Sequence, residues 1–148
     1  MKSKNTKYNG YYFRSRLEAR WAVFFDALGI DYRYEDQDFV LPDGVRYLPD
    51  FWLPDYHGGA FAEVKHEFTI EEKLKCRMLC EMTKKHVLLL EDTPGFKEVL
   101  LYTMNNKWEG YYKFYCLNGF LSPMDFDHGH LVKRAIMMAK SARFEFNS

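Results

Sequence analysis

The sequence lacks any apolar run that approaches the roughly 18 residues needed to cross a bilayer, so it predicts no membrane-spanning helix and no membrane partner. The opening stretch MKSKNTKYNG is polar and no apolar stretch follows it, which argues against a signal peptide. Cysteine is also scarce, and the three residues Cys76, Cys80 and Cys116 suit reduced thiols better than a disulfide framework. We therefore expect a cytoplasmic protein.

Internal repeats and low-complexity linkers are absent too. The chain has 148 residues, 47% of them hydrophobic, which suffices for one domain with a real core, and we predict a single domain over residues 1–148. The net charge is zero, but lysine and arginine dominate residues 1–20, whereas aspartate and glutamate dominate residues 21–63. This division fits a basic surface for phosphates beside an acidic pocket for a cation, or a solvated surface on which charges cluster by chance.

Two capping-box patterns predict where helices begin. The stretch Ser15-Arg-Leu-Glu18 precedes apolar residues at helical spacing, and this first helix should end at Gly29. The stretch Thr69-Ile-Glu-Glu72 repeats the pattern ahead of a second helix that should run to about Thr83. A last helix is expected over Leu131–Ala142 from its helical spacing of apolar residues.

Runs of alternating or continuously apolar residues between these helices predict strands. The expected strands are Ile30–Tyr34, Phe39–Leu41, Val45–Leu53, Phe61–His66, His86–Leu90 and Gly110–Leu117, with turns at Pro42-Asp43-Gly44, Asp55–Gly59 and Asn118-Gly119. The order of helices and strands predicts an α/β sandwich around a central mixed β-sheet.

Charged residues interrupt the segment YLPDFWLPDYHGGAFAEVKHE, which is otherwise suited to burial. A buried charge is costly unless it is paired or binds a metal ion, so Asp50, Glu63 and Lys65 call for an explanation. Opposed residues of an antiparallel pair have a constant sum of residue numbers, and a two-residue turn at Tyr56-His57 sets Asp50 opposite Glu63. A turn one residue later keeps both carboxylates on one face, whereas an even sum separates them unless a bulge intervenes. Lys65 lies on the Glu63 side of its strand.

Two carboxylates at such a distance favour a hard cation, most naturally Mg²⁺, which keeps several waters and is completed by substrate phosphate. A neighbouring ammonium group can hold a phosphate oxygen or help to activate water. Together these groups can hydrolyse a phosphodiester, because the metal supplies both the nucleophile and the neutralising charge.

The same residues resemble those of the PD-(D/E)XK nuclease superfamily, small phage-type endonucleases in particular. The resemblance rests on Pro49-Asp50, on Glu63-Val64-Lys65, and on the run FRSRLEARWAVFFDALGI with its Glu18. It covers about residues 13–90, lacks none of the expected acidic or basic positions, and leaves residues 91–148 as a variable C-terminal extension. It implies a restriction-endonuclease-like α/β/α sandwich and, if a phage encodes the chain, a location in the host cytoplasm.

The resemblance also implies roles for individual residues. Asp50 and Glu63 would ligate Mg²⁺ or Mn²⁺ with the Val64 carbonyl, Glu18 would bind the metal directly or through water, and Lys65 would orient or activate the attacking water. The implied activity is a metal-dependent DNA endonuclease that leaves 5′-phosphate and 3′-hydroxyl ends, and structure-specific cutting is one form of it. Double-strand cutting needs two active sites, so a homodimer is a further expectation. To the motif we add three arginines expected to contact the nucleic-acid backbone, Arg14, Arg16 and Arg20.

Each feature also has a purely structural interpretation. Glu18 can simply cap its helix, and Glu63 with Lys65 can form an exposed ion pair worth under about 1 kcal/mol. Cys76 and Cys80 with His86 or Cys116 can be imagined as a zinc site, although their spacing is irregular for one. The alternative function is a nucleic-acid-binding or partner-binding protein of the same fold that does not cleave.

Overall fold

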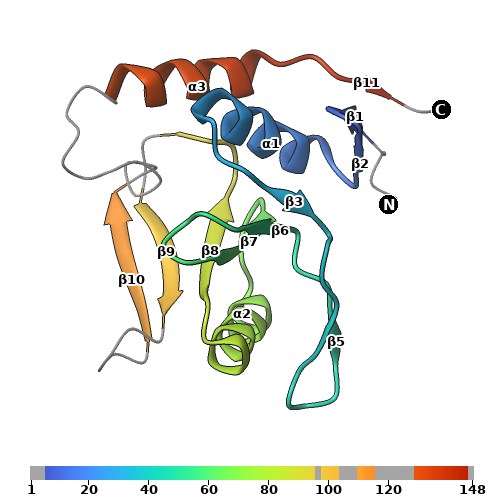
Figure 1. The fold of residues 1–148 in the computed structure, drawn as a ribbon, viewed down its shortest axis with the longest axis vertical. Helices are drawn as coiled ribbons and strands as arrows, with labels where there is room; N and C mark the ends of the chain where they lie inside the picture. The colour runs from blue at the N-terminus through green and yellow to red at the C-terminus, as the bar shows by residue number, and fades with distance from the viewer. Residues whose placement is uncertain (1–5, 96–97, 104–109, 116–128, 147–148) are drawn as a thin grey trace.

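The structure, a computed structural model, describes residues 6–95, 98–103, 110–115 and 129–146. Most of the helices and strands are labelled in Figure 1. In chain order they are β1 (Thr6–Tyr8), β2 (Tyr11–Phe13), α1 (Arg16–Leu28), β3 (Arg33–Tyr34), β4 (Phe39–Val40), β5 (Arg46–Tyr47), β6 (Phe51–Leu53), β7 (Ala60–Lys65), α2 (Ile70–Thr83), β8 (His86–Glu91), β9 (Glu98–Thr103), β10 (Gly110–Tyr115), α3 (Gly129–Ser141) and β11 (Glu145–Phe146).

A mixed sheet forms the centre of the described residues. Its strand order is β10-β9-β8-β7-β6-β3, in which β7 and β8 are parallel and the other neighbours are antiparallel. Strand β1 pairs with both β2 and β11, and β4 pairs with β5. The predicted α/β class with a central mixed sheet is therefore confirmed at this level of detail.

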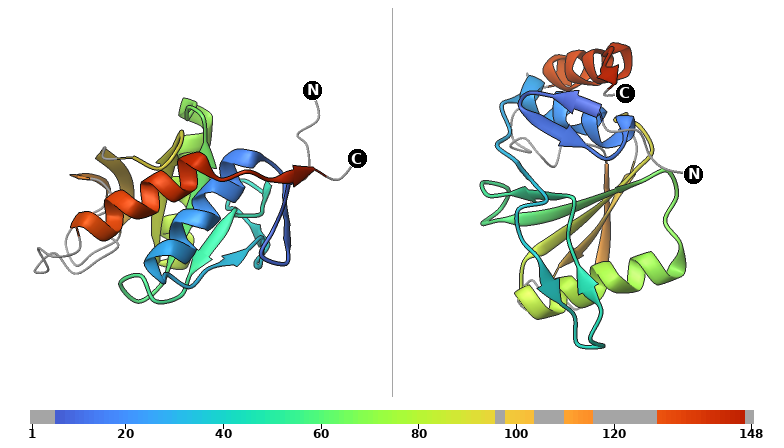
Figure 2. Two further views of the ribbon diagram at one scale, coloured as in Figure 1. Left: turned by 90° about the horizontal axis from the view of Figure 1, so that it is seen from above. Right: turned by 90° about the vertical axis from the view of Figure 1, so that its right-hand side faces the viewer.

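Helices lie on both sides of this sheet. The right-hand view of Figure 2 shows α1 and α3 together above it and α2 below it. Each side has its own cluster of buried residues, and β7 contributes to both: Ala60, Ala62 and Val64 belong to the cluster on the α1 side, and Phe61 to the cluster on the α2 side. Because side chains alternate along a strand, Glu63 and Lys65 lie on the α2 side with Phe61.

The two predicted helix starts are confirmed. The Ser15 hydroxyl oxygen accepts the Glu18 N–H at 3.1 Å, and α1 ends at Gly29, which adopts the left-handed conformation with φ 71°. At α2, Thr69 and Glu72 form a complete capping box. The last helix begins at Gly129, two residues before the predicted start.

The prediction of one strand over Val45–Leu53 is wrong. The chain forms β5 and β6 there, which belong to two different sheets. Pro49 lies between them and has no N–H to donate to a strand ladder, and the Asp50 carbonyl instead accepts the Glu35 N–H at 2.9 Å. The strand predicted over Ile30–Tyr34 is likewise shorter, because only its last two residues pair with β6.

Some predictions fall outside the described residues, namely those for Cys116 and the turn at Asn118-Gly119. Strands β1, β2, β9 and β11 were not predicted. In the described part of the chain, no helix combines the length and the apolar character required to cross a membrane.

Candidate functional site

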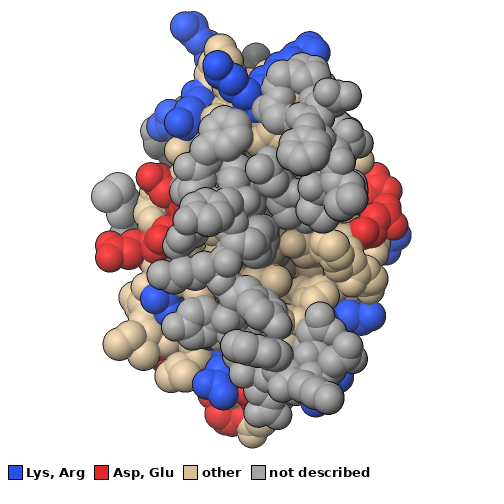
Figure 3. All heavy atoms as spheres, turned by 90° about the vertical axis from the view of Figure 1, so that its left-hand side faces the viewer, with Lys and Arg blue, Asp and Glu red and all other residues tan. Residues whose placement is uncertain are grey.

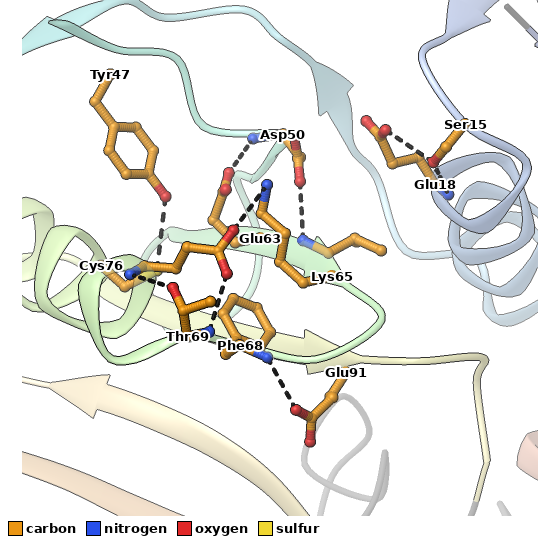
Figure 4. Close-up of polar contacts among 12 residues, drawn as sticks. Ser15, Glu18, Tyr47, Asp50, Glu63, Lys65, Phe68, Thr69, Cys76 and Glu91 are labelled. Atoms are coloured by element: carbon orange, nitrogen blue, oxygen red, sulfur yellow. Dashed lines mark hydrogen bonds and ion pairs between the residues drawn. The ribbon is translucent and has the colours of Figure 1, made fainter. Parts of the chain in front are cut away.

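The hairpin of β6 and β7 brings the two central carboxylates together. The register pairs Phe51 with Ala62, so its continuation by one residue sets Asp50 opposite Glu63, which is the first of the alternative registers that the sequence left open. The Asp50 N–H donates to Glu63 Oε1 at 2.6 Å, and the Val64 N–H donates to Asp50 Oδ2 at 2.8 Å (Figure 4). Each carboxylate is thus held by the backbone of the opposite strand.

The connection between these strands is longer than the predicted two-residue turn but keeps the same offset. Two successive turns form it, closed by hydrogen bonds from the Tyr56 N–H to the Leu53 carbonyl and from the Gly59 N–H to the Tyr56 carbonyl. Gly59 has φ 112°, and a Cβ atom there would lie 2.4 Å from a ring carbon of Trp52. Glycine at this position therefore lets the chain return against Trp52 in the required register.

Burial raises the pKa values of both carboxyl groups. Burial raises the pKa of Glu63 from 4.5 to about 7. Burial also raises the pKa of Asp50, and the neighbouring Glu63 and Glu18 charges raise it further. A divalent cation would offset this concentrated negative charge, so the electrostatics of the hairpin suit a metal ion.

Lys65 extends from the end of β7 beside the two carboxylates (Figure 4). Its Nζ lies 3.4 Å from Glu72 Oε2 of α2. Burial alone would lower the pKa of Lys65, but the carboxylates of Glu63, Asp50 and Glu72 outweigh burial and raise it. Lys65 is therefore an ammonium ion at neutral pH, which suits it to orienting water or phosphate better than to accepting a proton.

Glu18 approaches the site from α1 on the other side of the sheet. Its side chain is 7% exposed and extends toward Asp50 in Figure 4. One carboxylate oxygen accepts the Ser15 hydroxyl at 2.9 Å and the other accepts the Tyr34 hydroxyl at 2.5 Å. These two hydroxyl contacts replace the predicted reciprocal hydrogen bond to the Ser15 backbone. The negative charge of Glu18 also raises the pKa of Asp50.

The donor set fits a hard cation only in part. The described residues contain no group of three His, Cys, Asp or Glu side chains arranged to hold a metal ion. The hairpin offers two carboxylates and a backbone carbonyl, and Mg²⁺ commonly takes one or two carboxylates with water and phosphate as its remaining ligands. Oxygen donors of this kind favour Mg²⁺ or Mn²⁺ over zinc.

The three predicted nucleic-acid contacts differ in their surroundings. Arg20 Nη1 donates to the carbonyls of Ala139, Lys140 and Ala142 at 2.8, 3.0 and 3.1 Å, so it binds the C-terminal end of α3. Arg14 is exposed and its Nε lies 2.7 Å from Glu35 Oε2. Arg16 is exposed at the start of α1. Arg20 thus has a structural role, which leaves Arg14 and Arg16 as the better placed pair.

Lysine and arginine side chains also gather elsewhere. On the face shown in Figure 3 they cluster at the upper end of the molecule, where α3 lies. This helix carries Lys133, Arg134 and Lys140. The surface distribution is compatible with a phosphate backbone as ligand, but it identifies no specific contact.

Three residues near the carboxylates were missed by sequence analysis. Tyr34 donates a hydrogen bond to Glu18, Tyr47 lowers the pKa of Glu63, and Glu72 pairs with Lys65. The predicted cysteine alternative gains no support: Cys76 is buried, and its sulfur lies 3.6 Å from the Tyr47 hydroxyl. Only the capping box of Glu72 was visible in the sequence, and its link to Lys65 depends on how α2 packs.

Comparisons with known proteins add nothing to this geometry. Neither a scan against protein-family models nor a search of curated proteins matches this chain. The residues of the hairpin and their chemistry are therefore the basis of the function proposed below.

Proposed function

We propose that the protein is a metal-dependent DNA endonuclease of the PD-(D/E)XK type with a restriction-endonuclease-like fold. One observation carries the proposal: the hairpin register sets Asp50 against Glu63 with reciprocal backbone hydrogen bonds, and Lys65 follows on the same side of β7. A mixed sheet with helices on both faces supports the fold assignment. A purely structural ion pair does not require two carboxylates with raised pKa values at one point.

In this proposal Asp50 and Glu63, with the Val64 carbonyl, hold Mg²⁺ or Mn²⁺. An ion held there would supply positive charge to neutralise the phosphate and would lower the pKa of water. Lys65 donates hydrogen bonds that orient the attacking water or a phosphate oxygen, and Glu18 adds negative charge that favours the cation. The water oxygen forms a bond to phosphorus and the bond from phosphorus to the 3′ oxygen breaks. The proton passes to that oxygen, leaving 5′-phosphate and 3′-hydroxyl ends.

The direct test is cleavage of supercoiled plasmid, single-stranded DNA and a four-way junction with Mg²⁺, Mn²⁺ or EDTA. We expect cutting only with metal, and a loss of about a hundredfold or more in Asp50→Asn and in Lys65→Met. Asp55→Asn, an exposed change in the turn of the same hairpin, is the matched control and should cut normally. Metal-independent cutting, or full activity in Asp50→Asn, would contradict the proposal.

A non-cleaving nucleic-acid-binding protein is the second candidate. Glu18 favours it, because Ser15 and Tyr34 already hold both of its carboxylate oxygens. That function predicts binding of the same DNA substrates without cutting under any metal. Size-exclusion chromatography with light scattering tests the homodimer that double-strand cutting would call for.

A further inference from the structure

A pocket of about 190 Å³ opens between the segment around β5 and helix α2, beside the candidate site. Its lining includes Glu63 and Lys65, so it adjoins the end of β7 that carries two of the residues of the proposed chemistry. This volume is below the roughly 300 Å³ at which pockets begin to enclose drug-sized ligands. The pocket therefore fits a small group, such as a single phosphate with part of its sugar.

Cationic side chains reach this pocket from three separate elements. Arg46 comes from β5, Lys65 from β7 and Lys75 from α2. Arg46 also pairs with Asp38, but both of these side chains are largely exposed, so that pair holds the guanidinium weakly. Convergence of three cations on a small pocket is the arrangement expected for a phosphate.

Glu72 occupies the position where an anion would be expected. Its Oε1 accepts the Thr69 N–H at 3.0 Å, which caps α2, while its Oε2 lies 3.4 Å from Lys65 Nζ. At 3.4 Å, with both side chains partly exposed, the contact with Lys65 is loose enough for a stronger anion to replace it.

We propose that this pocket binds the phosphate of a nucleic-acid strand that neighbours the phosphate to be cut. Lys65 and Lys75 contact that phosphate, and Glu72 is the resident counter-anion that it displaces. The proposal rests on the proposed function, because it takes Glu63, the other acid of the lining, to be neutralised by the metal ion during cutting. It places the path of the strand across α2, a helix outside the catalytic motif.

The test measures binding of a labelled single-stranded oligodeoxynucleotide by fluorescence anisotropy in EDTA, where no cutting is expected, with Glu63→Gln present in every variant to remove the charge that the metal ion would neutralise. Lys75→Ala should weaken binding about threefold and lower the slope of log affinity against log salt by about 0.7. Glu72→Gln should tighten binding about threefold, because it removes the competing charge, and glutamine still accepts the capping hydrogen bond.

Matched controls separate the pocket from the general charge of the helix. Lys73→Ala and Glu71→Gln make the same charge changes on α2, and neither residue lines the pocket. Both controls should change affinity less than the corresponding pocket variants. If Lys73→Ala matched Lys75→Ala, or Glu71→Gln matched Glu72→Gln, the pocket would be no subsite. Unchanged melting temperatures would show that Glu72→Gln leaves α2 intact.

A further arm distinguishes a strand phosphate from a free one. Inorganic phosphate should displace the oligonucleotide no better than sulfate does at equal ionic strength, and selective displacement would indicate a pocket for free phosphate instead. The two proposals fail separately. If the protein does not cut DNA but Lys75→Ala weakens and Glu72→Gln tightens oligonucleotide binding, only the nuclease proposal is overturned. If it cuts with metal but neither variant changes the affinity in this way, only the subsite proposal is overturned.

Discussion

The two faces of β7 show how one strand can serve both a core and a site. On the α1 face, Ala60, Ala62 and Val64 pack into a cluster that contains eight residues of α1 and α3 with 0% exposure. On the α2 face, Phe61 is followed by the charged Glu63 and Lys65, and α2 buries only Cys76, Leu79 and Cys80. Apolar packing therefore stabilises the first face, whereas the second face carries charged residues and is less tightly packed.

The largest expected effect tests the apolar face. Phe24→Ala removes a side chain with 0% exposure from α1 and should lower the free energy of unfolding by about 3–5 kcal/mol. Urea denaturation measures this change. Leu74→Ala on α2, where Leu74 is 52% exposed, is the matched control and should cost under about 0.5 kcal/mol. Similar losses for the two variants would remove the contrast between the faces.

A substitution on the charged face should raise the free energy of unfolding instead of lowering it. Because folding raises the pKa of Glu63 from 4.5 to about 7, the folded chain binds more protons than the unfolded chain between these values. The stabilising contribution is thus complete below about pH 4.5 and is lost as the pH rises through about 7. Glu63→Gln should therefore stabilise the metal-free protein at pH 8, by on the order of 3 kcal/mol, and flatten its pH dependence.

Thermal melts in EDTA at pH 5 and pH 8 measure this effect. Adding Mg²⁺ at pH 8 should raise the melting temperature of the unsubstituted protein and not that of Glu63→Gln, since a ligand stabilises only the state that binds it. If Glu63→Gln were less stable than the unsubstituted protein at pH 8 without metal, the carboxylate would be a structural partner of the Asp50 N–H. Its charge would then not be what limits the stability of the protein.

The hairpin turn between β6 and β7 determines which residues of β7 lie on each face, and substitution of its glycine should be destabilising. Gly59→Ala places a Cβ atom 2.4 Å from the Trp52 ring at φ 112°, so the chain must shift or strain. We expect a loss of about 2 kcal/mol and a weaker response of the melting temperature to Mg²⁺, because the offset of Asp50 and Glu63 depends on this turn. Gly44→Ala, which also has positive φ but meets no atom within 4 Å, controls for backbone strain alone.

Local patterns explain which parts of this structure could be predicted. Ser15 and Thr69 cap their helices through residues three positions away, and a hairpin offset depends on a few residues between two strands. The β1–β2 hairpin also had a local signal that was missed: Asn9 and Gly10 both have positive φ, as a type I′ turn requires. Pro49 equally marked the break between β5 and β6.

Contacts between distant segments account for what could not be predicted. Tyr34 reaches Glu18 across 16 positions of sequence, and Arg20 reaches Ala139 across 119. No periodicity or spacing in the sequence predicts such a contact, because the contact depends on how separate helices and strands pack. The carboxylate pair of the site was therefore predictable, whereas the hydroxyls that hold its neighbours and the role of Arg20 were not.

The smallest expected effect distinguishes an arginine with a structural role, Arg20, from an arginine expected to bind nucleic acid, Arg16. Arg20→Gln should cost about 1 kcal/mol of stability, because the carbonyls at the end of α3 lose a charged donor. It should leave oligonucleotide affinity unchanged at fixed salt, whereas the exposed Arg16→Gln should lower affinity and the salt slope and leave stability within about 0.5 kcal/mol. Urea denaturation and anisotropy on both variants provide the comparison. If Arg20→Gln kept its stability but bound the oligonucleotide more weakly, Arg20 would be a nucleic-acid contact after all. The end of α3 would then be stabilised by its packing and not by Arg20.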